Sequence, residues 1–556
     1  MRSAHPALLL ATFGLFGCAD RSSDPGAGEV GGTVVITVPG GFPPSLPPII
    51  QEATSRAVAD QVFERLADIG EDLNTLGDRG FTPRLAQRWS WAPDSLSIAF
   101  ALDPRARWHD GRPVRASDVR FTLGLLKDPL TSSPFTTLLV NIDSISVADS
   151  LTAVVWFRRR TPEQFYDAAY QIEVLPEHVL GRVPRNQLRA ANVASVFVGS
   201  GPFRMSQYEP GVRLTLIADT ANYRGRPKLD RVIWSFSTDA GAAITQFMSG
   251  QSDIYDGVPT DVLPRLDSNP NLRVRPVTGF VYAYMAINQR DPRRNAAPHP
   301  IFADRQVRRA LSMALDREAM LRNVFGPTGV LGAGPYPSAL ADSAVRMLPF
   351  DRAAAAAMLD SAGWRAGADG IRSKDGRPLA FSILVPTSSA QRMRYAVLLQ
   401  EQFRAVGARV TVDARDIQGF IDRQNTRNFD MTLTAWSSDP AIGGIKQTWT
   451  TSGMVGGNNN MSYSNPQVDA LIDSALTGFD PVRTRQYAHR AYQMIVDDAP
   501  AVWLYDFVQN LGYHSRLRPV DVRATGWAFG LARWWIPEAE RIDRDRLGLR
   551  PPPPQP

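Results

Sequence analysis

The feature that most restricts the fold is a regular alternation of strand and helix patterns over residues 381–436. The β-rich run FSILV at 381–385 is followed by a helical pattern at 391–406. A second short strand pattern at 409–412, a further helix and a strand pattern at 429–436 complete the series. Strands that alternate with helices of this length are typical of an α/β unit. This part of the chain is therefore predicted to form a lobe around a mainly parallel sheet.

The rest of the chain mixes strand and helix patterns less regularly. Strands are predicted at 33–38 (TVVITV) and 97–102 (SIAFAL), and a helix capped by Ser117 follows the second strand. Apolar residues at helical spacing predict a helix over 305–323, and another is predicted over 351–362, where a glycine follows. This irregular mixture suggests a larger, discontinuous region built around the regular lobe.

The N-terminus has the pattern of an export signal. An apolar run at 7–16, too short to span a bilayer, ends in Leu15-Phe16-Gly17-Cys18, which resembles the bacterial lipobox. Cys18 is the only cysteine of the 556 residues. We expect residues 1–17 to be a lipoprotein signal peptide, Cys18 to carry the lipid, and 18–32 to form a flexible tether. The alternative is an ordinary secretory signal with a chance cysteine.

The composition limits the class of partner. The formal net charge is +6, but the 61 basic residues are interspersed with 55 acidic ones. No long basic run with interleaved aromatic residues is present, so a nucleic-acid partner is not expected. With Cys18 lipidated, no disulfide can form within the chain. More than 500 mature residues predict two or three domains that depend on burial alone for stability.

Five groups of motifs follow one another in an order and spacing typical of a known family. They are LAQRW (85–89) with FAL (100–102), WHDGRPV (108–114) and SDV (117–119); GPF (201–203) with NYRGRP (222–227); MSGQSDI (248–254); DRQVRRAL (304–311) with ALDR (314–317); and YSNPQVD (463–469). Through these motifs the chain resembles the oligopeptide/dipeptide-binding class of ABC-importer solute receptors, bacterial solute-binding protein family 5. The resemblance covers almost the whole mature length.

This resemblance implies a fold and a domain plan. The fold would be α/β, the two-lobed Venus-flytrap periplasmic-binding-protein fold with an extra inserted domain. Ligand would lie between the lobes and be engulfed by hinge closure. Lobe I would comprise 33–60, 200–285 and 505–540, the inserted domain 61–199 and lobe II 286–504, with a proline-rich tail at 541–556.

The function implied is that of an extracytoplasmic receptor, lipid-anchored at a membrane surface of the periplasm or cell envelope. It would deliver a small ligand, a di- or oligopeptide first of all, to the permease and ATPase subunits of an ABC importer. A monomer without metal or organic cofactor is expected. A sugar, an opine or a metal chelate is an alternative ligand, and a membrane sensor is an alternative partner.

An enzyme is the less favoured interpretation. The sequence contains no His-Glu-x-x-His zinc motif, no Gly-x-Ser-x-Gly nucleophile elbow and no Walker A loop. His109 is interpreted as a hydrogen-bonded turn histidine, and the adjacent Asp497 and Asp498 as a solvated helix end. An exported hydrolase with two carboxylates brought together by the fold stays open as an alternative.

The candidate ligand-binding residues come from the same resemblance. In peptide-binding relatives an aspartate three residues after a tryptophan binds the ligand ammonium, and here that pattern is Trp436 and Asp439. The alternative role for Asp439 is a turn cap before Pro440. An arginine that binds the ligand carboxylate in some relatives is replaced by Leu433, and Arg423 and Arg427 are nearby but unaligned. Four further candidates for the pocket are Tyr284, Tyr505, Phe135 and Glu52.

Overall fold

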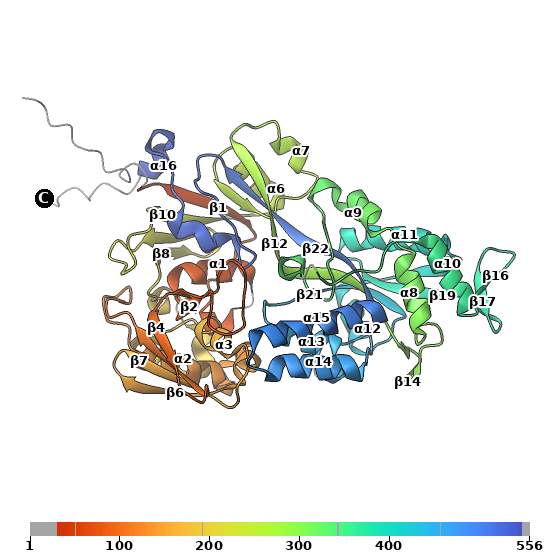
Figure 1. Cartoon of the computed structure of the whole chain (residues 1–556). Helices are drawn as coiled ribbons and strands as arrows, with labels where there is room; N and C mark the ends of the chain where they lie inside the picture. The colour runs from red at the N-terminus through yellow and green to blue at the C-terminus, as the bar shows by residue number, and fades with distance from the viewer. Residues whose placement is uncertain (1–29, 51, 192, 342–343, 456, 547–556) are drawn as a thin grey trace, which may run out of the picture.

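The computed structural model describes residues 30–50, 52–191, 193–341, 344–455 and 457–546. Within them, an eleven-stranded sheet runs through both lobes of the molecule (Figure 1). β15 (Val330–Leu331) pairs with β22 beside the main path of strands. The order along that path is β20 (Arg409–Arg415), β19 (Ala380–Pro386), β21 (Met431–Ser437), β12 (Leu272–Ile287), β22 (Ala501–His514), β11 (Ile254–Asp256), β1 (Thr33–Pro39), β10 (Arg231–Ser237), β9 (Arg213–Ala218) and β8 (Phe203–Glu209).

The two longest strands, β12 and β22, cross from one lobe to the other as an antiparallel pair. Their register shifts between Thr278 and Tyr282 on β12, where the partners on β22 are Val508 and Asp506. Three residues of β12 therefore face a single residue of β22, which is a bulge that bends the ladder. The hydrophobic cores on the two sides of this bulge are separate clusters. The bulge marks the passage between the lobes.

The structure of lobe II confirms the predicted alternation of strands and helices. Helix α11 (Ala390–Arg404) connects β19 to β20, and α12 (Ile417–Asn425) connects β20 to β21. β19 pairs in parallel with both β20 and β21. The prediction of a mainly parallel sheet holds for these three strands only, because β21 pairs antiparallel with β12. The complete sheet is mixed.

The single helix predicted over 305–323 is wrong. The structure has two helices, α8 (Arg305–Met313) and α9 (Arg317–Phe325), separated by a short break. The Asp316 carboxylate accepts a hydrogen bond from Ala319 N at 2.9 Å and caps α9. An aspartate at such a position starts a new helix, and apolar spacing alone does not reveal the break.

The cap predicted for the helix after residue 115 is also corrected. Helix α2 spans Ala116–Lys127, so Ser117 lies inside its first turn. Asp118 Oδ2 instead accepts a hydrogen bond from Arg115 N at 2.9 Å, and Asp118 Oδ1 accepts one from Glu177 N at 2.9 Å. The side chain that satisfies the free amide at this end is the buried aspartate.

A smaller antiparallel sheet lies beside lobe I, at the lower left of Figure 1. Its core is a separate cluster that runs in sequence from Leu66 to Val174 and contains the buried Trp108. The next buried residues, from Leu175 to Phe197, pack in the lobe I core instead. The strand order is β4 (Ala86–Trp91), β5 (Ser97–Leu102), β7 (Thr152–Phe157) and β6 (Ile142–Asp149).

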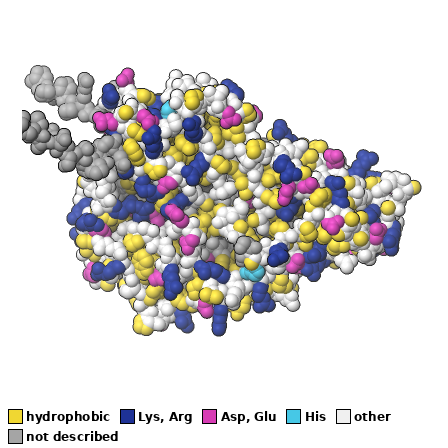
Figure 2. All heavy atoms as spheres, turned by 45° about the horizontal axis from the view of Figure 1, so that its top comes forward, with side chains coloured by type: hydrophobic (Ala, Val, Ile, Leu, Met, Phe, Trp, Pro, Cys, Tyr) yellow, Lys and Arg dark blue, Asp and Glu magenta, His cyan; other side chains and the backbone are white. Residues whose placement is uncertain are grey.

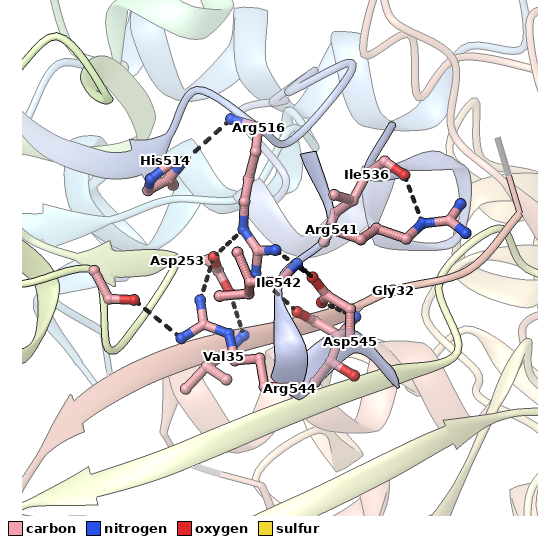
Figure 3. Close-up of polar contacts among 12 residues, drawn as sticks. Gly32, Val35, Asp253, His514, Arg516, Ile536, Arg541, Ile542, Arg544 and Asp545 are labelled. Atoms are coloured by element: carbon pink, nitrogen blue, oxygen red, sulfur yellow. Dashed lines mark hydrogen bonds and ion pairs between the residues drawn. The ribbon is translucent and has the colours of Figure 1, made fainter. Parts of the chain in front are cut away.

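Both ends of the described chain are joined through buried charges (Figure 3). Arg516 pairs with Asp253 at 2.8 Å and with Asp545 at 2.5 Å, and the exposure of all three side chains is 4% or less. Asp545 Oδ1 accepts a hydrogen bond from Thr33 N at 2.8 Å, and Arg544 pairs with Asp253 at 2.6 Å. Helix α16 (Asp543–Arg546) is thereby attached to the first strand of lobe I.

Several predicted features fall wholly or partly outside the described residues. They are the signal at 1–17, Cys18, most of the tether at 18–32 and the end of the tail. Residues 541–546, assigned to the tail by sequence, supply the buried Asp545 of lobe I. None of the helices in the described part of the chain is long and apolar enough to cross a membrane.

The remaining helices cover the sheets. They are α1 (Ala53–Val62), α3 (Gln164–Ala169), α4 (Glu177–Leu180), α5 (Val193–Val196), α6 (Ala240–Met248), α7 (Leu263–Leu266), α10 (Arg352–Ser361), α13 (Gly443–Trp449), α14 (Pro466–Thr477) and α15 (Pro481–Asp498). The short strands are β2 (Ala67–Asp68), β3 (Thr82–Pro83), β13 (Arg290–Asp291), β14 (Arg294–Pro298), β16 (Arg365–Ala366), β17 (Arg372–Lys374) and β18 (Arg377–Pro378).

Candidate ligand-binding site

A cavity of about 1190 Å³ lies between the lobes. Arg56 and Asp60 of α1 line it from lobe I, Tyr170 lines it from the inserted domain, and Phe325 and Arg394 line it from lobe II. The β12–β22 bulge contributes Gly279, Val281 and Phe507 to the wall. A volume above the usual 300–1,000 Å³ suits a ligand larger than a single metabolite.

The wall formed by α1 and the inserted domain carries charges that are already paired. Arg65 contacts Asp60 and Glu173 at 2.9 Å each, and Arg56 contacts Glu173 at 2.5 Å. Burial opposes ionisation of Glu173, but the guanidinium groups of Arg56 and Arg65 lower its pKa to about 2. Two more pairs extend the network, Arg84 with Asp68 and Arg224 with Glu64. Arginines and carboxylates thus alternate along this wall, and burial raises the pKa of Glu64 to about 8.

Arg394 differs from those arginines. It lies on α11 of lobe II, is exposed and lines the cavity. No ion pair of Arg394 is found among the described residues. It therefore offers a positive charge to an anionic group in the cavity. Nothing local in the sequence distinguishes Arg394 from the other arginines of the same helix.

Two carboxylates of the wall are held by neutral donors. Trp527 Nε1 donates to Asp256 Oδ2 at 2.8 Å, and Ser338 N donates to Asp506 Oδ2 at 2.5 Å. The Oδ1 atom of each is buried and has no hydrogen-bond partner among the described residues. Burial raises the pKa of both Asp256 and Asp506 to about 6.

None of the six predicted ligand-binding residues is among the described residues that line the cavity. Tyr284 is buried against Trp449 in the second core of lobe II. Tyr505 is buried between Tyr395 and Phe325, although the two residues that follow it do line the cavity. Trp436, on β21, lies half-buried against the same core as Tyr284.

Phe135 and Glu52 lie next to α1. The guanidinium carbon of Arg56 is 5.3 Å from the centre of the Phe135 ring, so Phe135 supports a residue of the cavity wall. Glu52 is exposed, and its carbonyl accepts a hydrogen bond from Arg56 N at 3.0 Å. Their contact with ligand stays a prediction, as does that of the other four.

Asp439 lies at the contact between lobe II and the inserted domain. Its Oδ1 accepts a hydrogen bond from Ala441 N at 2.8 Å, the bond expected of a turn cap. Burial raises the pKa of this carboxyl. Both roles of Asp439, as a ligand-binding residue and as a turn cap, therefore stay predictions. Arg423 pairs with Asp413 and Arg427 donates to Met454 O, so each has a partner away from the cavity.

A bridge from the inserted domain lies beside Asp439. Glu163 Oε1 accepts hydrogen bonds from Ile442 N at 2.5 Å and from Thr75 Oγ1 at 3.2 Å. Glu163 Oε2 accepts one from Gly443 N at 3.3 Å. Burial, together with the charge of Asp439, raises the pKa of Glu163 to about 7. The sequence contained no local signal for this bridge.

The histidine prediction is confirmed. His109 Nε2 lies 3.0 Å from Gly201 O, and Gly199 N donates to His109 Nδ1 at 3.2 Å. Both ring nitrogens are therefore used in holding the turn, and burial lowers the histidine pKa.

The prediction of a solvated end at Asp497 and Asp498 is wrong. Asp498 pairs with Arg305 at 3.0 Å and accepts a hydrogen bond from the Tyr463 hydroxyl at 2.8 Å. Asp497 pairs with Arg309 at 3.2 Å. These contacts attach α15 to α8.

The remaining electrostatic features are those of a surface with mixed charge. On the face drawn in Figure 2, basic and acidic side chains are interspersed. No group of three or more His, Cys, Asp or Glu side chains that could bind a metal ion is found in the part of the chain that the structure describes.

Comparison with known proteins identifies the family to which the chain is similar. Residues 80–454 match the family described as bacterial extracellular solute-binding proteins, family 5 middle. The oligopeptide-binding protein AppA of Bacillus subtilis is 25% identical over 452 residues, which cover 79% of this chain and 81% of AppA. The probable D,D-dipeptide-binding periplasmic protein DdpA of Escherichia coli is 25% identical over 468 residues, with 82% and 85% covered.

Solved structures agree on the fold. AppA of B. subtilis, determined with a nonapeptide, has a TM-score of 0.69 at 23% identity and covers 91% of this chain and 99% of its own. CtaP, an ABC transporter substrate-binding protein of Listeria monocytogenes, has a TM-score of 0.79 at 19% identity, with 92% and 100% covered. The predicted two-lobed α/β fold is confirmed. The chain belongs to family 5 of the bacterial extracellular solute-binding proteins.

Proposed function

We propose that this protein is an extracytoplasmic receptor that binds a peptide between its lobes and delivers it to an ABC importer. The observation that carries the proposal is the cavity of about 1190 Å³, which residues of both lobes and of the inserted domain line. Its volume is suited to several residues of an extended chain rather than to one small metabolite. A nonapeptide complex of a relative with the same fold supports this choice of ligand.

The two ends of a peptide carry opposite charges, and the receptor offers a partner for each. Asp439 is the proposed partner of the α-ammonium group by the family pattern; it lies outside the cavity lining, so the N-terminus of the peptide would have to extend to the contact between lobe II and the inserted domain. Arg394 is the proposed partner of the α-carboxylate, because it lines the cavity without an ion pair among the described residues. The constant parts of the peptide would thus be fixed, and the remaining cavity would accept varied side chains.

The lipid anchor and the transport partners belong to the same proposal. Lipidated Cys18 would hold the receptor at the outer face of a membrane that also contains the permease. A Cys18→Ser variant should then move from the detergent phase to the aqueous phase in detergent partitioning. A variant that stays in the detergent phase would remove the anchor from the proposal and leave the receptor role in place.

Native mass spectrometry of the purified protein tests the ligand class. We expect a bound species whose fragmentation gives a peptide sequence, and titration with that peptide should give a one-to-one complex. Co-purification of a sugar, opine or metal chelate instead, together with no binding of any member of a peptide library, would overturn the peptide proposal.

A further inference from the structure

The bulge between β12 and β22 projects one aromatic side chain into the cavity. On β22 the ladder is paired at Asp506 and again at Val508, so Phe507 is the single residue that faces the three bulged residues of β12. A bulge changes the direction of a side chain, and bulges are common beside functional sites. Phe507 lines the cavity and is 41% exposed, although Tyr505, the preceding residue on the same face of the strand, is 1% exposed. The bulge thus holds a large apolar ring at the surface of the cleft.

Phe507 is supported by aromatic rings of lobe II. The centre of its ring is 5.5 Å from that of Tyr505. Tyr505 in turn lies 4.7 Å from Phe325 of α9 and 4.9 Å from Tyr395 of α11. Tyr505 and Tyr395 are buried, whereas Phe325 lines the cavity together with Phe507. Rings packed in this way have few rotatable bonds, so Phe507 and Phe325 form a preformed apolar surface.

Apolar side chains of β12 continue this surface. Val277 and Val281 line the cavity on either side of Gly279, which is one of the bulged residues. A Cβ atom built on Gly279 would have one neighbour within 4 Å among the described residues, Ala524 O at 3.7 Å. The backbone of the bulge therefore borders open space in which a ligand side chain can lie. We call the following residues the apolar patch of the cavity: Val277, Val281, Phe325 and Phe507.

Arg394 borders the apolar patch. It directly precedes Tyr395, whose ring packs against both Phe325, at 6.2 Å, and Tyr505. The chain therefore places Arg394 beside the rings that support Phe507. Arg394 also lines the cavity, and no ion pair of Arg394 is found in the part of the chain that the structure describes. A cation next to an apolar surface is complementary to a carboxylate that has an apolar group close to it.

We propose that the apolar patch is a specificity subsite for the last residue of the bound peptide, which carries a large apolar side chain such as that of phenylalanine or leucine. This inference rests on the proposed peptide-receptor function. The α-carboxylate and the side chain of that residue leave the same Cα atom, so Arg394 binds the carboxylate while the side chain covers Phe507 and Phe325. This contact removes apolar surface from water, which is favourable. Because Phe507 lies in the bulge between the lobes, the contact also couples ligand binding to the hinge.

The experiment compares three peptides of equal length. The first ends in phenylalanine, the second ends in alanine, and the third has the composition of the first but carries its phenylalanine at the first position and alanine at the last. Calorimetric titration of the native protein should show the first peptide binding about tenfold tighter or more than the other two, because burial of a phenylalanine side chain contributes at least this factor. In Phe507→Ala this preference should fall to about threefold or less, while the affinity for the second peptide stays within about twofold. Phe350→Ala is the matched control and should retain the preference, since Phe350 is 47% exposed and lies outside the cavity lining.

The outcomes separate this subsite from the proposed function. Equal affinities of the native protein for the first two peptides, a preference that follows composition rather than position, or a preference that is unchanged in Phe507→Ala would overturn the subsite and leave peptide binding intact. Failure of every peptide to bind the native protein would overturn the proposed function itself. Phe507→Gln provides a second variant, with a side chain of similar length and no apolar ring, and it should lose the preference as Phe507→Ala does.

Discussion

The Glu163 carboxylate of the inserted domain accepts a hydrogen bond at 2.5 Å from the backbone amide of Ile442 in lobe II, 279 residues further along the chain. The β12–β22 bulge lies in a different connection between the lobes, where the chain itself passes. Lobe II therefore has a covalent connection to lobe I and a non-covalent one to the inserted domain. A substitution of Glu163 can therefore change the closure of the lobes without changing the hinge.

Closure at this bridge should depend on pH. Burial and the charge of Asp439 raise the Glu163 pKa from 4.5 to about 7, and Asp167 and Tyr166 face the same region without a cation. A raised pKa in the closed state means that closure is most favourable below the ordinary pKa and loses stability as the pH rises through about 7. The closed fraction should therefore fall between about pH 5 and pH 8. In Glu163→Gln, which cannot ionise, this dependence should be smaller.

Energy transfer between dyes on the inserted domain and lobe II measures that fraction. The Cys18→Ser background is free of cysteine, so two introduced thiols can be labelled selectively. Glu401→Gln, an exposed residue of α11, is the control and should retain the native pH dependence. An identical pH profile for Glu163→Gln and the native protein would contradict the titration assigned to this carboxyl.

Asp439→Asn separates ligand binding from turn capping. If Asp439 binds the α-ammonium, removing its charge should cost about 2–5 kcal/mol for a free peptide, or roughly 30- to several-thousand-fold in affinity. An N-acetylated peptide lacks that charge, so it should bind the native protein weakly and lose little more in the variant. This non-additivity is the mark of a direct contact. Additive losses in the four calorimetric titrations would leave Asp439 as the cap of Ala441.

Arg394→Gln tests the other end of the ligand. The variant should weaken binding of a peptide with a free carboxylate by about tenfold or more, since charged hydrogen bonds are worth roughly 1.5–3 kcal/mol. A peptide with a C-terminal amide should bind the native protein and the variant alike. Arg404→Gln, an exposed arginine of the same helix, should change neither affinity. Equal losses for both peptides would assign Arg394 to the shape of the wall.

Arg516→Ala should destabilise lobe I strongly. The change leaves the buried Asp253 with Arg544 alone and removes the salt bridge of Asp545, and an uncompensated buried charge costs about 3–5 kcal/mol. In denaturant unfolding, the midpoint of the transition that reports on lobe I should be lower than in the native protein. Arg322→Ala, which removes an exposed pair with Glu318, should change the free energy of unfolding by less than about 1 kcal/mol. A similar small change for Arg516→Ala would contradict the structural role of the network.

Sequence patterns predicted elements whose signals are local. The strand–helix series of lobe II follows from β-branched and helical spacing within about fifty-five residues, and the structure confirms it. The break before α9 was missed because Asp316 interrupts a helix without interrupting its apolar period. The antiparallel part of the sheet was missed because β12 and β22 are far apart in sequence.

The candidate site was harder to predict for the same reason. Glu163 meets Ile442, and Arg394 lines the same cavity as α1, only because the chain returns to the same place after long intervals. Motif spacing assigned the ammonium-binding role of the family's aspartate to Asp439. The structure shows that Glu163 of the inserted domain lies beside Asp439. A single sequence gives no signal that Glu163 or Arg394 lies near a distant segment, since neither of these two residues stands out in its local context.

Small-angle scattering of the mature protein, titrated with the peptide identified by mass spectrometry, tests the central claim most directly. If a peptide bound between the lobes draws them together about the β12–β22 bulge, the radius of gyration should fall with saturation at one ligand per protein. The change should be absent with the same peptide in N-acetylated form at equal concentration. A radius that stays constant while calorimetry shows the peptide bound would contradict closure on a ligand in the cleft.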